Sequence, residues 1–151
     1  MKPVFFYLMS LWPPFLGAGV RVRKISPDFR EIDVEMKLRF WNKNYVGTQF
    51  GGSLYSMTDP FYMLMLFENL GRDYIVWDKG ATIRFKRPGK GRVRAKFKLT
   101  AEQIEEIKAQ ADSGPKVEPV FKVEIKDDEG HVVAEVDKIL YVKRKEKRPT
   151  P

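Results

Sequence analysis

The apolar segment spanning residues 54–70 constrains this chain more than any other feature. Residues 63–67 are consecutive apolar residues, so the apolar surface of a helix here wraps around its circumference. Such a helix must be buried on most of its sides, and Gly71 is expected to cap its C-terminus. Pro60 falls inside the segment, so the helix either kinks there or restarts, with Asp59 as N-cap and Pro60 in the first position.

Alternating apolar and charged residues predict the strands that cover this helix. Residues 31–40 alternate without a fault, from Ile32 to Phe40 on the apolar face, as in a half-buried antiparallel strand. Further strands are expected at 20–23, 81–86, 93–99, 121–125 and 132–142, with a surface helix at 100–111. The simplest way to bury one helix among such strands is an α+β fold, a curved antiparallel sheet wrapped around a long central helix.

The length of 151 residues predicts a single domain, residues 1–151. Residues 1–16 are expected to form an N-terminal helical extension, because Val4, Leu8 and Leu11 recur at helical spacing and would dock on the core. The alternative, a signal peptide, is disfavoured by the two prolines that break the apolar run. The basic residues 144–151 are expected to be a disordered tail.

Composition excludes several classes of site. The chain has no cysteine, so thiolate chemistry and disulfides are excluded, and a reducing cytoplasm is the expected location. The only histidine, His131, lies in a predicted turn, so multi-histidine metal sites are excluded and no metal is expected. No apolar run is long enough to span a membrane. The net charge of +8 favours anionic partners, but alternation explains the basic strands, so nucleic-acid binding is not expected.

A polar loop with paired glycines, residues 44–53, leads into the apolar helix. The start of a helix offers free backbone N–H groups to an anion or a developing oxyanion. Asp59 follows about two turns later and supplies a single carboxylate. Together these features predict a site that receives a carbonyl group.

The sequence resembles the hotdog-fold thioesterase superfamily, in particular an uncharacterised branch (DUF4442-like) near the phenylacetate-pathway (PaaI) acyl-CoA thioesterases. The resemblance lies in the pattern Asn-x-x-Gly-x-x-Phe-Gly-Gly at residues 44–52, in Asp59, and in residues 81–89. It implies a hotdog fold, a homodimer or homotetramer, and hydrolysis of an acyl-CoA or acyl-carrier-protein thioester. No cofactor is implied, since coenzyme A enters as part of the substrate.

The resemblance also implies roles for individual residues. Asp59 would act as general base on water or as nucleophile. Gly51 would be the principal oxyanion donor, usually facing the carboxylate of another subunit, with Gly52 close by. Asn44 would orient the carbonyl or the attacking water.

Substrate contacts follow from the chemistry of an acyl-CoA. An acyl chain needs an apolar slot, and the candidates are Phe50, Tyr55, Met57, Phe61, Met63 and Met65. The phosphates of coenzyme A need cations, and the nearest candidates are Arg84, Lys86, Arg87 and Lys90.

Other interpretations of the same residues stay open. Asp59 is equally suited to capping a helix that restarts at Pro60, and the paired glycines to tight packing. The basic residues at 84–87 also suit the solvent face of a strand. Asp78 and Lys79 form either a turn with an ion pair or a charged pair near the site.

Two departures from the family pattern favour a second function. Phe50 stands where the family commonly has histidine, and Leu66 stands where it often has a hydroxyl residue. Both changes remove polar groups, so the alternative function is a non-catalytic acyl-CoA or lipid-binding hotdog protein.

Overall fold

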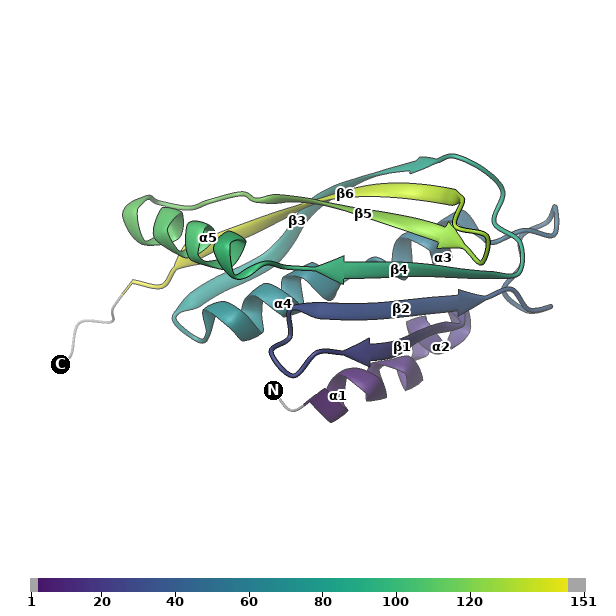
Figure 1. Ribbon diagram of the computed structural model, residues 1–151, viewed down its shortest axis with the longest axis horizontal. Helices are drawn as coiled ribbons and strands as arrows, with labels where there is room; N and C mark the ends of the chain where they lie inside the picture. The colour runs from purple at the N-terminus through teal and green to yellow at the C-terminus, as the bar shows by residue number, and fades with distance from the viewer. Residues whose placement is uncertain (1–2, 147–151) are drawn as a thin grey trace.

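The computed structural model describes residues 3–146, which form one antiparallel sheet with helices on its concave side and at its ends (Figure 1). The elements in chain order are α1 (Pro3–Leu8), the 3-10 helix η1 (Met9–Leu11), α2 (Pro13–Ala18), β1 (Val20–Ile25), β2 (Glu31–Lys37), α3 (Gly51–Ser56), α4 (Phe61–Leu70), β3 (Tyr74–Phe85), β4 (Arg92–Lys98), α5 (Ala101–Ser113), β5 (Val120–Asp127) and β6 (Val132–Arg144). The strand order is β1-β2-β4-β5-β6-β3, so β1 and β3 are the two edges. The predicted α+β class, with a curved sheet around a central helix, is confirmed.

Burial of the central helix holds the two layers together. Phe61, Met65 and Leu66 of α4 are fully buried against the inward side chains of the sheet. Aromatic rings carry much of this contact, since the Phe61 ring lies 5.0 Å from that of Phe97 on β4 and 5.8 Å from that of Phe15 on α2. Truncating one such side chain to alanine typically costs about 3–5 kcal/mol.

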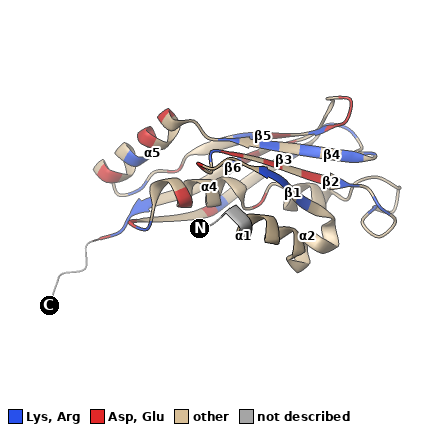
Figure 2. Ribbon diagram, turned by 60° about the horizontal axis from the view of Figure 1, so that its bottom comes forward, with Lys and Arg blue, Asp and Glu red and all other residues tan. Residues whose placement is uncertain are grey.

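Strand alternation is as predicted over most of the sheet, and charged residues mark the outer face of β1, β2 and β4 (Figure 2). The prediction was wrong at the end of β2, which stops at Lys37 and leaves Phe40 81% exposed. The reason is a turn closed by Asn42, whose Oδ1 accepts a hydrogen bond from the Arg39 backbone N–H at 2.6 Å. This turn takes the chain out of the sheet before Phe40 is reached.

The central helix is interrupted, as one of the two interpretations of Pro60 predicts. α3 ends at Ser56, and α4 begins at Phe61 after a cis Asp59–Pro60 peptide bond. Pro60 itself is the N-cap residue, and no side chain caps the helix. The prediction of Asp59 as N-cap is therefore wrong, because its carboxylate contacts Lys138 of β6 instead. Gly71 caps the C-terminus as predicted, with φ of 84°.

The N-terminal helices dock on the core through other residues than predicted. Leu8 and Leu11 are exposed, and the side chain of Val4 lies outside the described residues. Phe6 and Phe15 are the buried anchors, since the Phe6 ring lies 5.1 Å from that of Phe29 and the Phe15 ring lies 5.8 Å from that of Phe61. The extension consists of three short pieces and ends at Ala18.

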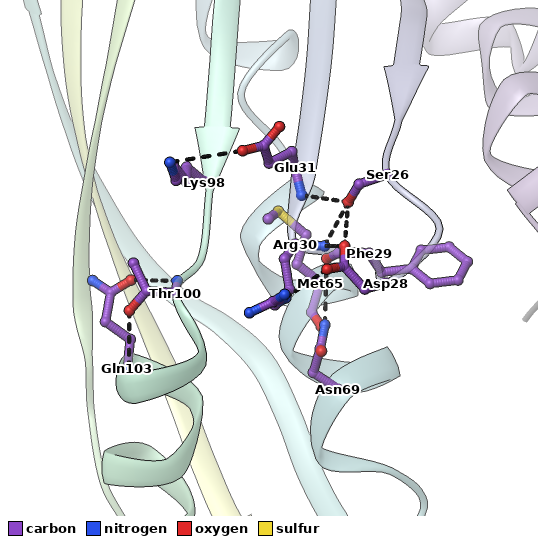
Figure 3. Close-up of polar contacts among 10 residues, drawn as sticks. All are labelled: Ser26, Asp28, Phe29, Arg30, Glu31, Met65, Asn69, Lys98, Thr100 and Gln103. Carbon is purple, nitrogen blue, oxygen red and sulfur yellow. Dashed lines mark hydrogen bonds and ion pairs between the residues drawn. The ribbon is translucent and has the colours of Figure 1, made fainter.

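Polar contacts stabilise the end of the molecule opposite the loop with paired glycines, residues 44–53, here called the glycine loop (Figure 3). Ser26 Oγ accepts hydrogen bonds from the backbone N–H groups of Arg30 and Glu31, which closes the β1–β2 turn. Asn69 Nδ2 of α4 donates to the Phe29 carbonyl of that turn at 3.3 Å. These bonds fix the far end of α4 against the sheet edge.

The last helix and the C-terminal residues complete the fold. Thr100 and Gln103 form a capping box at the start of α5, the predicted surface helix (Figure 3). β6 includes Arg144, and the Lys145 backbone N–H donates to the Asp73 carbonyl at 2.8 Å. The remainder of the predicted tail, residues 147–151, lies outside the described residues.

Candidate active site

The glycine loop is built around Asn44. Its Oδ1 accepts hydrogen bonds from the backbone N–H groups of Val46 (3.1 Å) and Thr48 (2.9 Å), and its Nδ2 donates to Thr48 Oγ1 (2.9 Å). These bonds satisfy the turn that precedes α3. The Asn44 amide is thus engaged within the loop, although its side chain lines the pocket described next.

Gly51 is the first residue of α3, and its lack of a side chain is required by a neighbour. A Cβ atom at Gly51 would lie 3.0 Å from Cζ of Phe85, and one at Gly52 would lie 2.6 Å from Cε1 of Phe50. The N–H groups of Gly51, Gly52 and Ser53 have no acceptor among the described residues. α3 has only six residues, so these local N–H groups, more than a helix dipole, make its start attractive to an oxyanion.

An open pocket of about 380 Å³, here called the glycine pocket, lies in front of Gly51. Its walls include Asn44, Phe85 and Arg87. Gln49 also lines this pocket, although the sequence patterns did not predict it as a site residue. The Gln49 side chain is buried, its Nε2 donates to the Gly91 carbonyl at 3.1 Å, and its Oε1 accepts nothing from the described residues. Buried acceptors without a partner are rare and often mark a functional site.

Asp59 lies outside the glycine pocket and belongs to a second group. Lys138 Nζ lies 3.1 Å from Asp59 Oδ1, within a hydrogen bond, and 3.0 Å from Asp78 Oδ1, as an ion pair. The Lys138 side chain is 0% exposed, whereas those of Asp59 and Asp78 are 45% and 22% exposed. The Tyr55 ring covers the ammonium at 5.2 Å. We call Lys138, Asp59 and Asp78 the lysine–carboxylate cluster.

Three elements bring this cluster together. Asp59 comes from the break between α3 and α4, Asp78 from β3, and Lys138 from the neighbouring strand β6. A β-bulge between Asp78 and Gly80 shifts the register of β3 there. Lys79 pairs with Glu118 at 2.7 Å and does not join the cluster. Of the two open interpretations, Asp78 is therefore a charge near the site and Lys79 a surface ion pair.

Lys138 was missed, although its sequence position carries a signal. Along β6 the inward positions are Ala134, Val136, Lys138, Leu140 and Val142. A lysine in step with buried apolar residues is rarely buried without a partner. Strand parity therefore marks Lys138 as an internal cation that requires carboxylates.

The cluster has unusual titration behaviour. Burial raises the pKa of the Asp78 carboxyl to about 6, with the neighbouring Asp59 carboxyl adding to the rise and Lys138 opposing it. Burial lowers the pKa of Lys138, but hydrogen bonding and charge from Asp78 and Asp59 outweigh it, and the net pKa is raised. Lys138 is therefore an ammonium at neutral pH. A proton on Asp78 exchanges close to physiological pH, where acid–base groups are useful.

The four predicted phosphate ligands fall into two classes. Arg84 is paired with Asp137 at 2.6 Å and with Glu135 at 3.4 Å, and Lys86 also contacts Glu135. Arg87 and Lys90 are exposed, and neither has a carboxylate partner within residues 3–146. Arg87 also lines the glycine pocket, so it is the cation best placed there.

The predicted acyl-binding residues are also divided. Phe61, Met57 and Met65 are fully buried core residues, and so is Leu66, which stands at the family's hydroxyl position. Phe50 is exposed, while Tyr55 and Met63 are partly buried. An accessible acyl slot thus has Phe50, Tyr55 and Met63 as its candidates.

Within residues 3–146, no group of three His, Asp or Glu side chains is placed to hold a metal ion. Likewise, none of the helices in that range combines the length and apolarity needed to cross a bilayer.

Comparisons with solved structures give the fold. The chain is 23% identical to PA5026 of Pseudomonas aeruginosa, a protein of unknown function and probable thioesterase, with a TM-score of 0.81 over 94% of this chain and 95% of that one. It is 14% identical to the thioesterase HI1161 of Haemophilus influenzae, with a TM-score of 0.69 over 95% and 92% of the chains.

A third solved structure, a protein of unknown function from Chlorobaculum tepidum, is 14% identical, with a TM-score of 0.73 over 92% and 91% of the chains. No curated protein matches the chain. The predicted hotdog fold is confirmed by these structural neighbours. A family model described as a domain of unknown function, DUF4442, matches residues 2–142, and the chain belongs to that family.

Proposed function

We propose that this protein hydrolyses an acyl-CoA or acyl-carrier-protein thioester and that Asp59 is its catalytic carboxylate. The observation that carries the proposal is the half-exposed Asp59 carboxylate, held at a helix break by the buried Lys138 ammonium. Solved neighbours described as thioesterases support the reaction class. The ion pair with the buried Lys138 ammonium gives the Asp59 carboxylate a defined direction.

The carboxylate serves the reaction in one of two ways. As general base, Asp59 takes a proton from water while the water oxygen adds to the thioester carbonyl carbon. Collapse of the tetrahedral intermediate breaks the C–S bond, and the leaving thiolate takes up the proton. As nucleophile, Asp59 adds to the carbonyl carbon, and the C–S bond breaks as the thiolate leaves. Water then hydrolyses the mixed anhydride, which releases the acid, restores the Asp59 carboxylate and supplies the proton that the thiolate takes up.

Asp78 is proposed as the second acid–base group. It contacts the same ammonium as Asp59, and its raised pKa of about 6 lets it exchange a proton near neutral pH. Lys138 is a positioning residue in this scheme, because it contacts the two carboxylates and is itself fully buried.

The oxyanion donor is proposed to be the Gly51 amide, with the Gly52 amide near it. Within one chain Gly51 faces a pocket that does not include Asp59. A homodimer, alone or within a homotetramer, would complete the site by bringing Gly51 of one subunit to Asp59 of another. The edge strand β3 supports this assembly, since it leaves Trp77 and Phe85 exposed and carries Asp78.

Arg87 and Lys90 are proposed to bind the phosphates of coenzyme A. They are the two predicted cations without a carboxylate partner in the described part of the chain, so binding a phosphate breaks no ion pair. The expected cellular location is the cytoplasm, because a chain without cysteine suits a reducing compartment.

The test is hydrolysis of a panel of acyl-CoA thioesters of increasing chain length, followed with a thiol reagent. Replacement of Asp59 by Asn or Ala is expected to lower kcat by about 10²–10⁴. The matched control is Asp137→Asn, which removes a carboxylate of β6 from the paired set around Arg84. Absence of turnover on every chain length, or full activity in Asp59→Ala, would refute the proposal.

A non-catalytic acyl-thioester binder is the second candidate, and specific side chains favour it. Phe50 presents an exposed aromatic ring where the family has histidine, and Leu66 is fully buried where a hydroxyl would assist. Calorimetry with a non-hydrolysable acyl-CoA separates the two functions. Tight binding without turnover of the matching thioester supports the binder, and no heat of binding excludes it.

A further inference from the structure

Exposed apolar side chains are concentrated in two short segments of this molecule. Most of the large apolar residues exposed in residues 3–146 lie between residues 5 and 16 or between residues 40 and 50. Leu11 and Leu16 are 65% and 58% exposed, and Trp12 and Trp41 are each about half exposed. A contiguous patch of this kind usually marks an interaction surface.

Asn42 joins the two segments into one surface. Its Nδ2 donates to the Ala18 carbonyl at the end of α2 and to the Lys37 carbonyl at the end of β2, each at 3.0 Å. The side chain is buried, and an added Cβ at Gly19 would lie 2.7 Å from that Nδ2. The loop after β2 is therefore fixed to the N-terminal helices.

Two hollows make this surface continuous with the helix break at Asp59. One, of about 530 Å³, lies between the helices, with Leu8, Leu11 and Trp12, and Pro60 on its far wall. The other, of about 620 Å³, extends from Pro13 to Trp41 and Gly52. We call the residues Leu8, Leu11, Trp12, Leu16, Trp41 and Phe50 the apolar face.

The two segments that carry the apolar face contain basic residues but no acidic ones. Residues 3–20 contain no charged residue, and α2 is uncharged throughout in Figure 2. Residues 36–58 contain Lys37, Arg39 and Lys43 but no Asp or Glu. All three cations are exposed, and none has a carboxylate partner in the described part of the chain. This charge pattern complements an anionic surface.

The N-terminal helices of the apolar face are also separate from the β3 edge proposed for assembly. α1 and α2 lie along β1, whereas β3 forms the opposite edge of the sheet (Figure 1). A second copy paired through β3 therefore leaves the N-terminal helices uncovered.

We propose that the apolar face docks on the surface of an anionic lipid bilayer. Short helices with exposed Leu and Trp insert their side chains among the headgroups, and adjacent cations attract acidic lipids. Lys37, Arg39 and Lys43 provide those cations, so docking is electrostatic as well as apolar. Because Pro60 and Gly52 lie at the hollows, docking turns the neighbourhood of Asp59 toward the bilayer. This inference goes beyond thioester hydrolysis and holds whether or not the protein is an enzyme.

The test is flotation of the full chain with phosphatidylcholine vesicles, with and without 30% phosphatidylglycerol (roughly the charge of an acidic membrane). Binding at least about tenfold tighter to the acidic vesicles is expected. The variant L8S/L11S/L16S should weaken binding to acidic vesicles by about tenfold or more, while the buried anchors Phe6 and Phe15 stay intact.

Two variants that each remove three positive charges distinguish local attraction to the acidic lipids from an effect of net charge. K37Q/R39Q/K43Q should lose most of the preference for acidic vesicles. The matched control K96Q/K108Q/K122Q removes the same charge from exposed sites on β4, α5 and β5 and should change binding by less than about threefold. Equal effects of the two variants would overturn the proposal.

Two further readouts keep the test decisive. In W77F, the remaining tryptophans Trp12 and Trp41 both belong to the apolar face, so brominated lipids should quench most of the fluorescence. Absence of both flotation and quenching would overturn the proposal even if the leucine variant failed to fold. If L8S/L11S/L16S instead halved the mass measured by light scattering, the face would be a subunit interface and the proposal would be wrong.

Discussion

The glycine pocket and the lysine–carboxylate cluster place functional groups in opposite ways. The pocket is formed by one loop and its neighbours, and its chemistry resides in backbone N–H groups that stay in place whatever side chains surround them. The cluster is formed by side chains from three elements that are far apart in the sequence. Local sequence therefore specifies the pocket, whereas only correct packing of the sheet on the helix assembles the cluster.

Breaking the cluster should have the largest effect on stability. Lys138→Met removes the cation and leaves two carboxylates facing each other in a partly buried site, at an expected cost of about 3 kcal/mol in the free energy of unfolding. Urea denaturation measures it. The matched control Lys79→Met breaks an exposed pair with Glu118 and should cost less than about 1 kcal/mol. Equal costs would show that the cluster is no more than a surface ion pair.

The cluster should also make stability depend on pH in an unusual direction. The Asp78 pKa is raised to about 6, so between about pH 4 and pH 6 the folded protein holds a proton that the unfolded chain has lost. This contribution to stability is therefore present at low pH and declines as pH rises toward 6, by on the order of 2 kcal/mol. The free energy of unfolding should be measured from pH 4 to pH 7, and the decline should be absent in Asp78→Asn.

Asp137→Asn is the control for that experiment, since Asp137 is paired with Arg84 on the outer side of β6. If Asp78→Asn and Asp137→Asn changed the pH dependence equally, the decline would not arise in the cluster. The proposed catalytic role adds a second observable, an inflection near pH 6 in kcat/KM that Asp78→Asn removes.

The glycine pocket should respond in activity and hardly at all in stability. In Gly51→Ala the new Cβ meets the Phe85 ring at 3.0 Å, so either the ring or the start of α3 must shift by a few tenths of an ångström. We expect about a tenfold loss in kcat, because oxyanion donors act only when well aimed. Alanine favours the helix, so the free energy of unfolding, measured by thermal denaturation, should change by less than about 1 kcal/mol.

The double variant Gly51→Ala/Phe85→Ala identifies the cause of that loss. Removing the ring gives the new methyl group room, so activity should recover relative to Phe85→Ala alone. Failure to recover would mean that steric displacement of α3 does not explain the loss.

The smallest expected effect concerns coenzyme A. Arg87→Ala should raise KM for acyl-CoA about three- to tenfold, because one exposed phosphate contact is lost. The kcat value should change little. KM for a short thioester without the nucleotide should not change. Arg84→Ala, whose guanidinium is already paired with Asp137, should alter KM for acyl-CoA less than Arg87→Ala does.

Much of the fold and half of the candidate site were predictable from residue patterns. Period-two alternation located the strands, except that it missed residues 74–80 of β3, and the apolar stretch at 63–67 required a buried helix. Glycines at 51 and 52 and the capping pair Thr100 and Gln103 act through neighbouring backbone, so their geometry follows from local sequence.

The errors share one physical cause. Phe40 and Leu8 were assigned to buried faces by periodicity, but the turn at Asn42 takes Phe40 out of the sheet, and α1 instead buries Phe6, whose ring lies 5.1 Å from that of Phe29. Capping was the alternative, local interpretation of Asp59, but its carboxylate instead contacts Lys138, which is distant in the sequence. Each time, a contact outside the local pattern decided the outcome.

The sequence by itself determined that a curved antiparallel sheet encloses one apolar helix and that a glycine loop opens that helix, because periodicity and backbone freedom are local properties. The alternation along β6 also places Lys138 at an inward position, which indicates a buried cation. The tertiary structure alone decided that Lys138 meets Asp59 and Asp78, and that Asn42 joins the N-terminal helices to the loop after β2. Partners of a buried charge are chosen by three-dimensional proximity, which local patterns do not encode.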